Sequence, residues 1–435
     1  MSDKKIKVVW LCTIANQQIH NHIKFAPWRL KNIIKTCAGK SALKLTERAV
    51  WNTNAIKEYE KFNDISLTVI FHYAGIRGDV QRFSINGINY ICYRSEDDHF
   101  SHSFFKLFGR TSETYPKGRK IVSSLIEELS PDIVHVIGAE NPNYSICALD
   151  ISHDIPLVVS LQTLMSEPDF KENYYINEES YLFRSNVERM VLERSDYIAS
   201  RIKKYNTFIK ENIKNDAVFL QMPLALGVDI NTESSTKEYD FVYFANNISK
   251  AADDAIESFA LAYKMNPSLT LNISGSYDIA FKRQLEKRMK GLKIDKNVFI
   301  TGPKQTHEDV IKQIKKSRFA LLPLKIDLIS STIREAMACG LPVVTTITPA
   351  TPNLNKERES VLLSNKGDYQ AMANNMLRLV EDVNYAQMIS NNALLTIQEK
   401  SSNKAFMKMW RKAYYEIIDN FKNGTPFSED VIFEG

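Results

Sequence analysis

The residues best suited to chemistry lie within one stretch of the chain, residues 320–346. Two carboxylates, Asp327 and Glu335, stand eight positions apart in it. Free N–H groups and the positive end of the dipole make the start of a helix an anion site. We therefore expect a phosphate or pyrophosphate to bind here, with Glu335 placed to accept hydrogen bonds from a ribose. The hydroxyl residues that precede a run of strong helix formers and suit this helix start are Ser330, Ser331 and Thr332.

A strand, a helix and a second strand must position these groups. The apolar residues 320–324 predict a buried strand, and residues 333–339 predict a helix. Gly340 suits the left-handed position that follows a helix, and Pro342 prevents the helix from continuing. Residues 341–346 predict the next strand. This βαβ unit is typical of doubly wound sheets, which bind ligands at the carboxyl ends of their strands.

Strands and helices alternate along most of the chain, which favours an α/β fold with parallel sheets. A chain of 435 residues is too long for one core. The polar segment 231–238 separates two runs of alternation and is the expected linker, and an amphipathic run over 406–421 predicts a last helix. The expected domains are residues 1–230, 231–405 and 406–435.

Residues 335–344, EAMACGLPVV, resemble the signature of the retaining GT-B glycosyltransferases of family 4, or glycosyl transferases group 1. The resemblance implies two doubly wound, Rossmann-like domains facing across a cleft, with the last helix crossing back to the first domain. It implies transfer of a sugar, with retention of configuration and without a metal, from a nucleotide-diphosphate donor to a hydroxyl acceptor. Asp327 would then contact the donor sugar and Glu335 the ribose, as candidate catalytic residues. After Asp327 the chain lacks the family's usual Gly-aromatic-Gly turn.

Further donor-binding positions follow from the same resemblance. Lys250 matches a lysine that meets the diphosphate, but Asn246 stands where an arginine is usual. The missing cation would weaken stabilisation of the departing nucleotide, so that the enzyme is slow or inactive unless another residue compensates. Gly302 and Pro303 resemble the loop against which the base rests through its backbone, so UDP and GDP are not distinguished. The basic residues that could compensate for the arginine are Lys304, Lys325 and Arg334.

The first domain would bind the acceptor at the carboxyl ends of its strands. His135 closes a predicted strand much as the family's acceptor-side histidine does, so it is also a candidate catalytic residue, although a single histidine on an apolar strand is equally a core residue. No Ser-His-Asp arrangement is apparent. The resemblance implies that the leaving phosphate helps to deprotonate the acceptor. The strand-end residues are Thr13, Asn16, His135, Gly138, Glu140, Gln162 and Thr163, of which Thr13, Asn16, His135 and Gln162 are the acceptor-side candidates.

Composition points to an ordinary globular protein, with 44% hydrophobic and 25% charged residues and a net charge of +5. Five scattered cysteines indicate reduced thiols and a cytoplasmic location, and we expect no metal, disulfide framework, signal peptide or membrane span. Asp97 and Asp98 fit a solvated loop, and His20 and His22 diverge on a helix. The aromatic segment 104–110 leaves open a peripheral contact with the inner membrane face, beside an ordinary helix end. The modest charge gives no support for nucleic-acid binding.

The resemblance therefore implies a glycosyltransferase that uses a nucleotide sugar, with UDP or GDP, and needs no further cofactor. Its acceptor would be a lipid-linked or oligosaccharide intermediate of surface polysaccharide or glycolipid assembly. Two alternatives remain. A nucleotide-sugar epimerase could use the same scaffold but needs an acid–base group near the sugar. A catalytically inactive, glycosyltransferase-like binding subunit would explain the departures at Asn246 and after Asp327.

Overall fold

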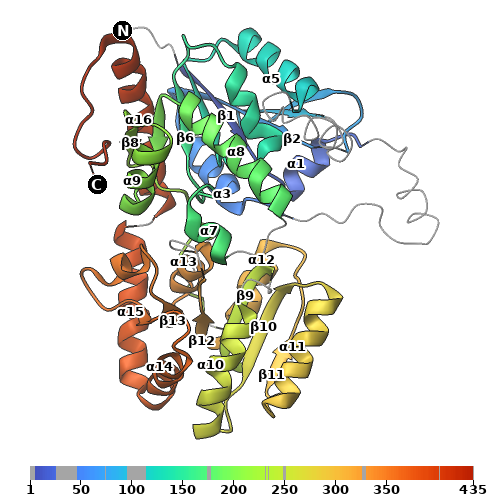
Figure 1. Cartoon of the computed structure of the whole chain (residues 1–435), viewed down its shortest axis with the longest axis vertical. Helices are drawn as coiled ribbons and strands as arrows, with labels where there is room; N and C mark the ends of the chain where they lie inside the picture. The colour runs from blue at the N-terminus through green and yellow to red at the C-terminus, as the bar shows by residue number, and fades with distance from the viewer. Residues whose placement is uncertain are drawn as a thin grey trace, which may run out of the picture. The chain divides into compact units, whose positions relative to one another are not determined.

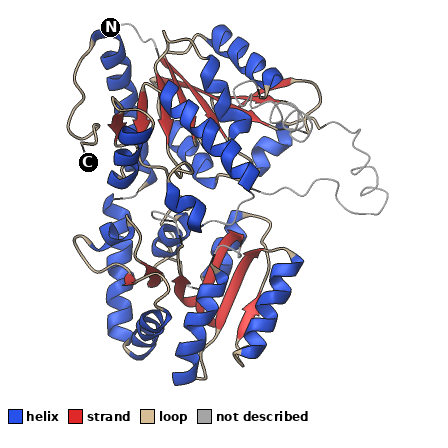
Figure 2. Cartoon of the chain, viewed as in Figure 1, coloured by secondary structure: helices blue, strands red, loops and turns tan. Residues whose placement is uncertain are grey.

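The computed structural model describes residues 5–25, 47–73, 75–95, 114–173, 178–230, 232–233, 235–247, 251–325, 330–400 and 402–434. The chain divides into two compact units: unit 1 is Met1–Ala225 with Asn403–Gly435, and unit 2 is Leu226–Ser402. In each unit helices surround a sheet of mainly parallel strands (Figures 1 and 2). Within the described residues, no helix is both long and apolar enough to cross a membrane.

The sheet of unit 1 has the order β3-β4-β2-β1-β5-β6-β7-β8. All neighbouring strands are parallel except the hairpin of β3 and β4. The chain therefore crosses from one side of β1 to the other, and the switch lies between β1 and β5. The strands are β1 (Ile6–Cys12), β2 (Ile65–His72), β3 (Val80–Ile85), β4 (Ile88–Tyr93), β5 (Ile133–Ile137), β6 (Leu157–Ser160), β7 (Tyr197–Ala199) and β8 (Val218–Leu220).

The last helix of the chain, α16 (Asn403–Asn423), belongs to unit 1. Its apolar residues recur at helical spacing, and Trp410, Tyr414 and Ile417 are buried in the same core as β1. Trp10 of β1 donates its indole N–H to the Tyr414 hydroxyl at 2.8 Å. The other helices of unit 1 are α1 (Gln17–His22), α3 (Val50–Tyr59), α5 (Pro116–Leu129), α6 (Pro142–Ser145), the 3₁₀ helix η2 (Ile146–Asp150), α7 (Pro168–Asn173), α8 (Glu178–Arg194) and α9 (Lys203–Asn212).

The sheet of unit 2 is wholly parallel, with the order β11-β10-β9-β12-β13-β14. In chain order this is 3-2-1-4-5-6, the Rossmann arrangement, whose switch point lies between β9 and β12. The strands are β9 (Tyr239–Asn247), β10 (Leu271–Ser276), β11 (Val298–Ile300), β12 (Ser317–Leu322), β13 (Val343–Thr346) and β14 (Leu362–Ser364). The helices are α10 (Ala252–Met265), α11 (Ile279–Gly291), α12 (His307–Ile314), α13 (Ser331–Ala338), the 3₁₀ helix η4 (Thr351–Asn355), α14 (Tyr369–Glu381) and α15 (Val383–Lys400).

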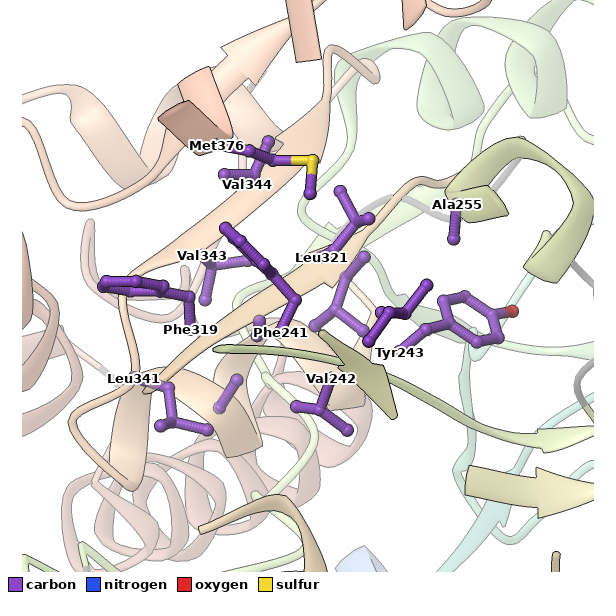
Figure 3. Close-up of a cluster of buried hydrophobic side chains, with 14 of the residues drawn as sticks. Phe241, Val242, Tyr243, Ala255, Phe319, Leu321, Leu341, Val343, Val344 and Met376 are labelled. Atoms are coloured by element: carbon purple, nitrogen blue, oxygen red, sulfur yellow. The ribbon is translucent and has the colours of Figure 1, made fainter. Parts of the chain in front are cut away.

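The core of unit 2 explains why its strands read as continuous apolar runs. Phe241 and Val242, which lie on opposite faces of β9, are fully buried in this core, as are Leu321 of β12 and Val344 of β13 (Figure 3). Strands of a parallel sheet are covered by helices on both faces, so neither face of the strand can be polar. The sheet edge at the carboxyl ends is therefore where polar side chains can gather.

Candidate functional site

Helix α13 begins at the carboxyl side of β12, beside the switch point of unit 2. Ser330 is its N-cap: the hydroxyl accepts a hydrogen bond from the Thr332 N–H at 3.3 Å. The first turn of the helix contains no acidic residue. Gly340 follows the helix with a φ of +69°, as its left-handed position requires. The predicted strand, capped helix and second strand are thus present as β12, α13 and β13.

Glu335 is buried on α13, at 5% exposure. Burial raises the pKa of its carboxyl group, while the nearby His307 and Arg334 act in the opposite direction. Its Oε1 lies 3.7 Å from Nε2 of His307, at the start of α12. A Cβ on Gly227 would lie only 2.2 Å from that Oε1, so any side chain at 227 would collide with the carboxylate. Glu335, His307 and the backbone at Gly227 therefore meet at one point.

The loop after β11 lies beside the carboxyl end of β10. Gly302 has a φ of +70°, and its carbonyl accepts a hydrogen bond from Gly275 of β10 at 3.4 Å. Pro303 is exposed next to it. The hydroxyl of Tyr277 lies 3.6 Å from where a Gly302 Cβ would be. The two loop residues expected to face the base are thus at the same sheet edge as α13.

The structure describes only some of the other residues that the sequence singles out. Asp327 and Lys250 lie outside the described residues, as do Asp97, Asp98 and segment 104–110. Asn246 lies near the end of β9, and its side chain is likewise not described. Lys325, a basic residue suggested as a replacement for the family's arginine, forms ion pairs with Asp253 at 2.9 Å and Asp254 at 3.5 Å. The carboxylates of Asp253 and Asp254, at the start of α10, therefore already neutralise the positive charge of Lys325.

His135 is a core residue of unit 1, which corrects its assignment as a catalytic, acceptor-side residue. The side chain is fully buried, and its ring lies 4.7 Å from that of Trp410, centroid to centroid. Its Nδ1 lies 2.6 Å from the Tyr414 hydroxyl, and its Nε2 lies 2.7 Å from the Ser160 hydroxyl. Burial lowers the pKa of the imidazole to about 3. With both ring nitrogens occupied in the core, His135 presents none to a substrate.

The remaining first-domain candidates lie at strand ends, where they make structural contacts. Asn16 caps α1: its side chain accepts from the Ile19 N–H at 2.9 Å. The backbone carbonyl of Thr13 accepts a hydrogen bond from Asn52 at 2.9 Å. Gln162 is half-buried and donates to the carbonyl of Ile137 at 3.2 Å.

The two histidines of α1 have separate hydrogen-bond partners. His20 Nε2 lies 3.0 Å from the Tyr73 hydroxyl, and His22 Nδ1 lies 2.8 Å from the Gln18 carbonyl. Within the part of the chain that the structure describes, no three His, Cys, Asp or Glu side chains are grouped so as to hold a metal ion.

The sequence assigns no role to His307 or Gly227, and it predicts Glu140 only as one of several strand-end residues. His307 opens a helix behind the capping residue Thr306, and Gly227 follows an apolar run, so neither carries a local signal of function. These positions stand out through contacts with residues far along the chain.

Solved structures share the two-unit architecture over nearly the whole chain. The sucrose-phosphate synthase of Thermosynechococcus elongatus matches with a TM-score of 0.65 at 14% identity, covering 95% of this chain and 99% of its own. Anabaena HepE in complex with UDP and glucose matches with a TM-score of 0.61 at 15% identity, covering 94% and 99%. At such identity the likeness establishes the fold. The protein has the GT-B fold of two Rossmann-like domains, as its sequence predicts.

Residues 229–395 match the family described as Glycosyl transferases group 1. The matched segment contains the switch point of unit 2, helix α13 and Glu335. The match thus lies wholly within unit 2, and the family resemblance of residues 335–344 is confirmed for this unit. Membership of family 4 in particular stays a prediction.

Curated relatives are distant. An uncharacterized glycosyltransferase of Methanocaldococcus jannaschii is 20% identical over 262 residues, covering 57% of this chain and 65% of its own. The N-acetyl-alpha-D-glucosaminyl L-malate synthase of Bacillus anthracis is 21% identical over 252 residues, covering 55% and 65%. The matches thus span just under two thirds of each relative's length.

Proposed function

We propose that the protein is a retaining glycosyltransferase, which moves a sugar from a nucleotide-diphosphate donor to a hydroxyl group of an acceptor. The observation that carries the proposal is the buried carboxylate of Glu335 beside the capped start of α13, inside the segment that matches the group 1 family. The names of two similar proteins support it. HepE was solved with UDP and glucose, and the Bacillus anthracis relative is named as an N-acetylglucosaminyl malate synthase.

Each part of the site has a role in this proposal. The free N–H groups at the start of α13 bind the diphosphate, with Lys250 as the second positive partner. A buried carboxylate needs hydrogen-bond donors, and the two ribose hydroxyls supply them to Glu335. The loop at Gly302 and Pro303 rests against the base. Asp327 binds hydroxyls of the donor sugar.

The reaction follows from these contacts. The bond between the anomeric carbon and the phosphate oxygen breaks, and its electron pair stays on the departing nucleotide. The acceptor oxygen bonds to the anomeric carbon on the face that the phosphate leaves, and the acceptor proton passes to the phosphate. The helix N–H groups and Lys250 stabilise the negative charge that develops, so the site needs no metal ion.

For the acceptor we propose a lipid-linked or oligosaccharide intermediate of surface polysaccharide or glycolipid assembly. The protein would work in the cytoplasm, with a peripheral contact at the inner membrane face. The net charge of +5 supports this contact, because anionic lipid headgroups attract positive protein surfaces.

The first experiment measures nucleotide binding by thermal shift with UDP, GDP, ADP and TDP. The nucleotide that raises the melting temperature most is then compared with its 2′,3′-dideoxy analogue, in the wild type and in Glu335→Gln. Glu308→Gln is the matched control, because Glu308 is an exposed carboxylate on the neighbouring helix α12.

We expect the wild type and Glu308→Gln to prefer the ribonucleotide about tenfold or more, since hydrogen bonds to a charged group are strong. Glu335→Gln should lose most of this preference. If Glu335→Gln keeps the same preference for the ribonucleotide over the dideoxy analogue, Glu335 does not bind the ribose. If none of the four nucleotides binds the wild type, the proposed function is refuted.

A second candidate is a binding subunit without transferase activity. The observation that favours it is the pairing of Lys325 with Asp253 and Asp254, which leaves that lysine unsuited to replace the family's arginine. Tight binding of an intact nucleotide sugar, without turnover on hydroxyl acceptors, would favour this candidate over the enzyme.

A further inference from the structure

The sheet of unit 1 has its own switch point, between β1 and β5. Doubly wound sheets bind ligands at the carboxyl ends of the strands that flank such a point. The chain leaves β5 there through Gly138, whose φ of +94° lies in the left-handed region. The loop that follows, residues 139–141, is buried or half-buried and leads into α6.

Three polar side chains close over the α-carbon of Gly138. A Cβ at this position would lie 2.8 Å from the Tyr144 hydroxyl, 2.9 Å from Gln162 Nε2 and 2.9 Å from Glu140 Oε1. These groups come from α6, from the loop after β6 and from the loop after β5. The missing side chain at 138 therefore allows a polar cluster to form at the place where a ligand is expected.

One atom of this cluster has unused bonding capacity. Tyr144 and Gln162 donate to the carbonyl of Ile137, at 2.6 and 3.2 Å, and Glu140 Oε1 accepts from Asn141 Nδ2 at 2.8 Å. The other carboxyl oxygen of Glu140, Oε2, has no hydrogen-bond partner among the described residues, although Glu140 is only 6% exposed. Leaving a buried acceptor unpaired costs free energy, so a bound donor group at this oxygen would be favoured.

Helix α8 fixes both loops that carry the cluster. Arg184 donates from Nε to the backbone carbonyl of Glu140 at 2.8 Å. One turn further on, the buried carboxylate of Glu188 accepts from the N–H groups of Met165 at 3.0 Å and Ser166 at 2.7 Å. Burial raises the pKa of Glu140 to about 7; Glu188 adds to this effect, and a backbone hydrogen bond and Arg184 oppose it. The unpaired oxygen thus belongs to a loop with fixed backbone contacts.

We propose that Glu140 is the residue of unit 1 that binds a hydroxyl group of the acceptor, through its unpaired oxygen Oε2. The proposal rests on the proposed function, because only a transferase needs an acceptor. The hydroxyl donates its proton in a hydrogen bond to the carboxylate. Because Oε2 is buried, the hydroxyl group can reach it only after a change of the Glu140 rotamer, and such changes are common at binding surfaces.

The test uses the full-length protein and the variant Glu140→Gln, which keeps the size of the side chain. Glu193→Gln is the matched control, because Glu193 is an exposed carboxylate on α8. The probes are N-acetylglucosamine and n-octyl β-D-glucoside below its micelle concentration, both measured with saturating nucleotide. Binding is followed by tryptophan fluorescence, since all four tryptophans, at positions 10, 28, 51 and 410, belong to unit 1.

We expect at least one probe to bind the wild type and Glu193→Gln, and to bind Glu140→Gln about tenfold more weakly. We also expect the melting temperature of Glu140→Gln at pH 8 to equal or exceed that of the wild type, because a buried, incompletely paired charge is removed. Equal probe affinity in Glu140→Gln, or a wild type that binds neither probe, would overturn the proposal. A lower melting temperature with unchanged affinity would show a structural role instead. Nucleotide binding that persists in these cases would leave the proposed function standing.

Discussion

Replacement of His135 by glutamine should change how the stability of unit 1 depends on pH. The imidazole is fully buried between Tyr414 and Ser160, and burial lowers its pKa from 6.5 to about 3. Glutamine can still form hydrogen bonds at this position but cannot take up a proton near neutral pH. The comparison therefore isolates the cost of keeping this histidine neutral.

The sign and size of the effect follow from proton binding. Between pH 6.5 and 3 His135 is protonated in the unfolded chain but not in the folded protein. Its contribution to the free energy of unfolding is therefore fully present above pH 6.5 and is lost as the pH falls. Each pH unit below 6.5 lowers the free energy of unfolding of the wild type by about 1.4 kcal/mol. Lowering the pH from 7 to 5 should therefore reduce the stability of the wild type relative to His135→Gln by about 2 kcal/mol.

Two other buried groups act in the opposite direction. Burial raises the pKa of Glu140 and of Glu188 to about 7. The folded state therefore holds their protons more tightly, and stability falls as the pH rises from 4.5 toward 7. Both groups are present in the wild type and in the variant, so their contributions cancel in the difference.

The assay is denaturant unfolding followed by tryptophan fluorescence, which reports on unit 1 because every tryptophan lies there. Ser160→Ala is the control, since it removes one hydrogen bond of His135 and keeps the imidazole. Its difference from the wild type should stay nearly constant with pH. A difference between the wild type and His135→Gln that is the same at pH 7 and pH 5 would refute the burial argument.

Two further predictions concern the site in unit 2. Gly227→Ala should weaken nucleotide binding about tenfold or more, because its Cβ would lie 2.2 Å from Glu335 Oε1. Gly291→Ala is the control, since apart from its chain neighbours and the helix's own backbone no atom lies within 4 Å of its Cβ position. Equal nucleotide affinities of the two variants, measured by thermal shift, would contradict the contact between residue 227 and Glu335. The thermal shift caused by the preferred nucleotide should be the same with magnesium and with EDTA, because the proposed diphosphate site uses helix N–H groups. A shift that requires magnesium would contradict a metal-independent site.

The fold could be predicted because its signals are local. Each helix or strand is indicated by residues within it or a few positions away. Examples are the apolar runs, the helix formers, the N-cap Ser330 and the helix-ending residues Gly340 and Pro342. The structure places the N-cap at Ser330 and a φ of +69° at Gly340. The alternation of such elements predicts two doubly wound sheets of mainly parallel strands, and among the described strands only the β3–β4 hairpin departs from the parallel arrangement.

The site was harder to predict because its contacts are distant in sequence. His135 appeared to close a strand, but β5 continues to Ile137, and the partner Tyr414 is 279 residues away. No pattern around His135 could show that the last helix covers it. The contact between Gly227 and Glu335 cannot be predicted from local sequence either, because it depends on how the first residues of unit 2 pack against α13.

The switch point of unit 2 offers two helix starts to an anion, and their charges distinguish them. Helix α10 follows β9 and carries Asp253 and Asp254 in its first turn, where Lys325 pairs with them. These carboxylates stabilise the helix dipole, and one lysine offsets only one of their two charges, so the start of α10 is less favourable for a diphosphate than a helix start without acidic residues. Helix α13 follows β12 and has no acidic residue in its first turn. An anion at this edge of the sheet should therefore bind at α13, which places it on the helix that also carries Glu335.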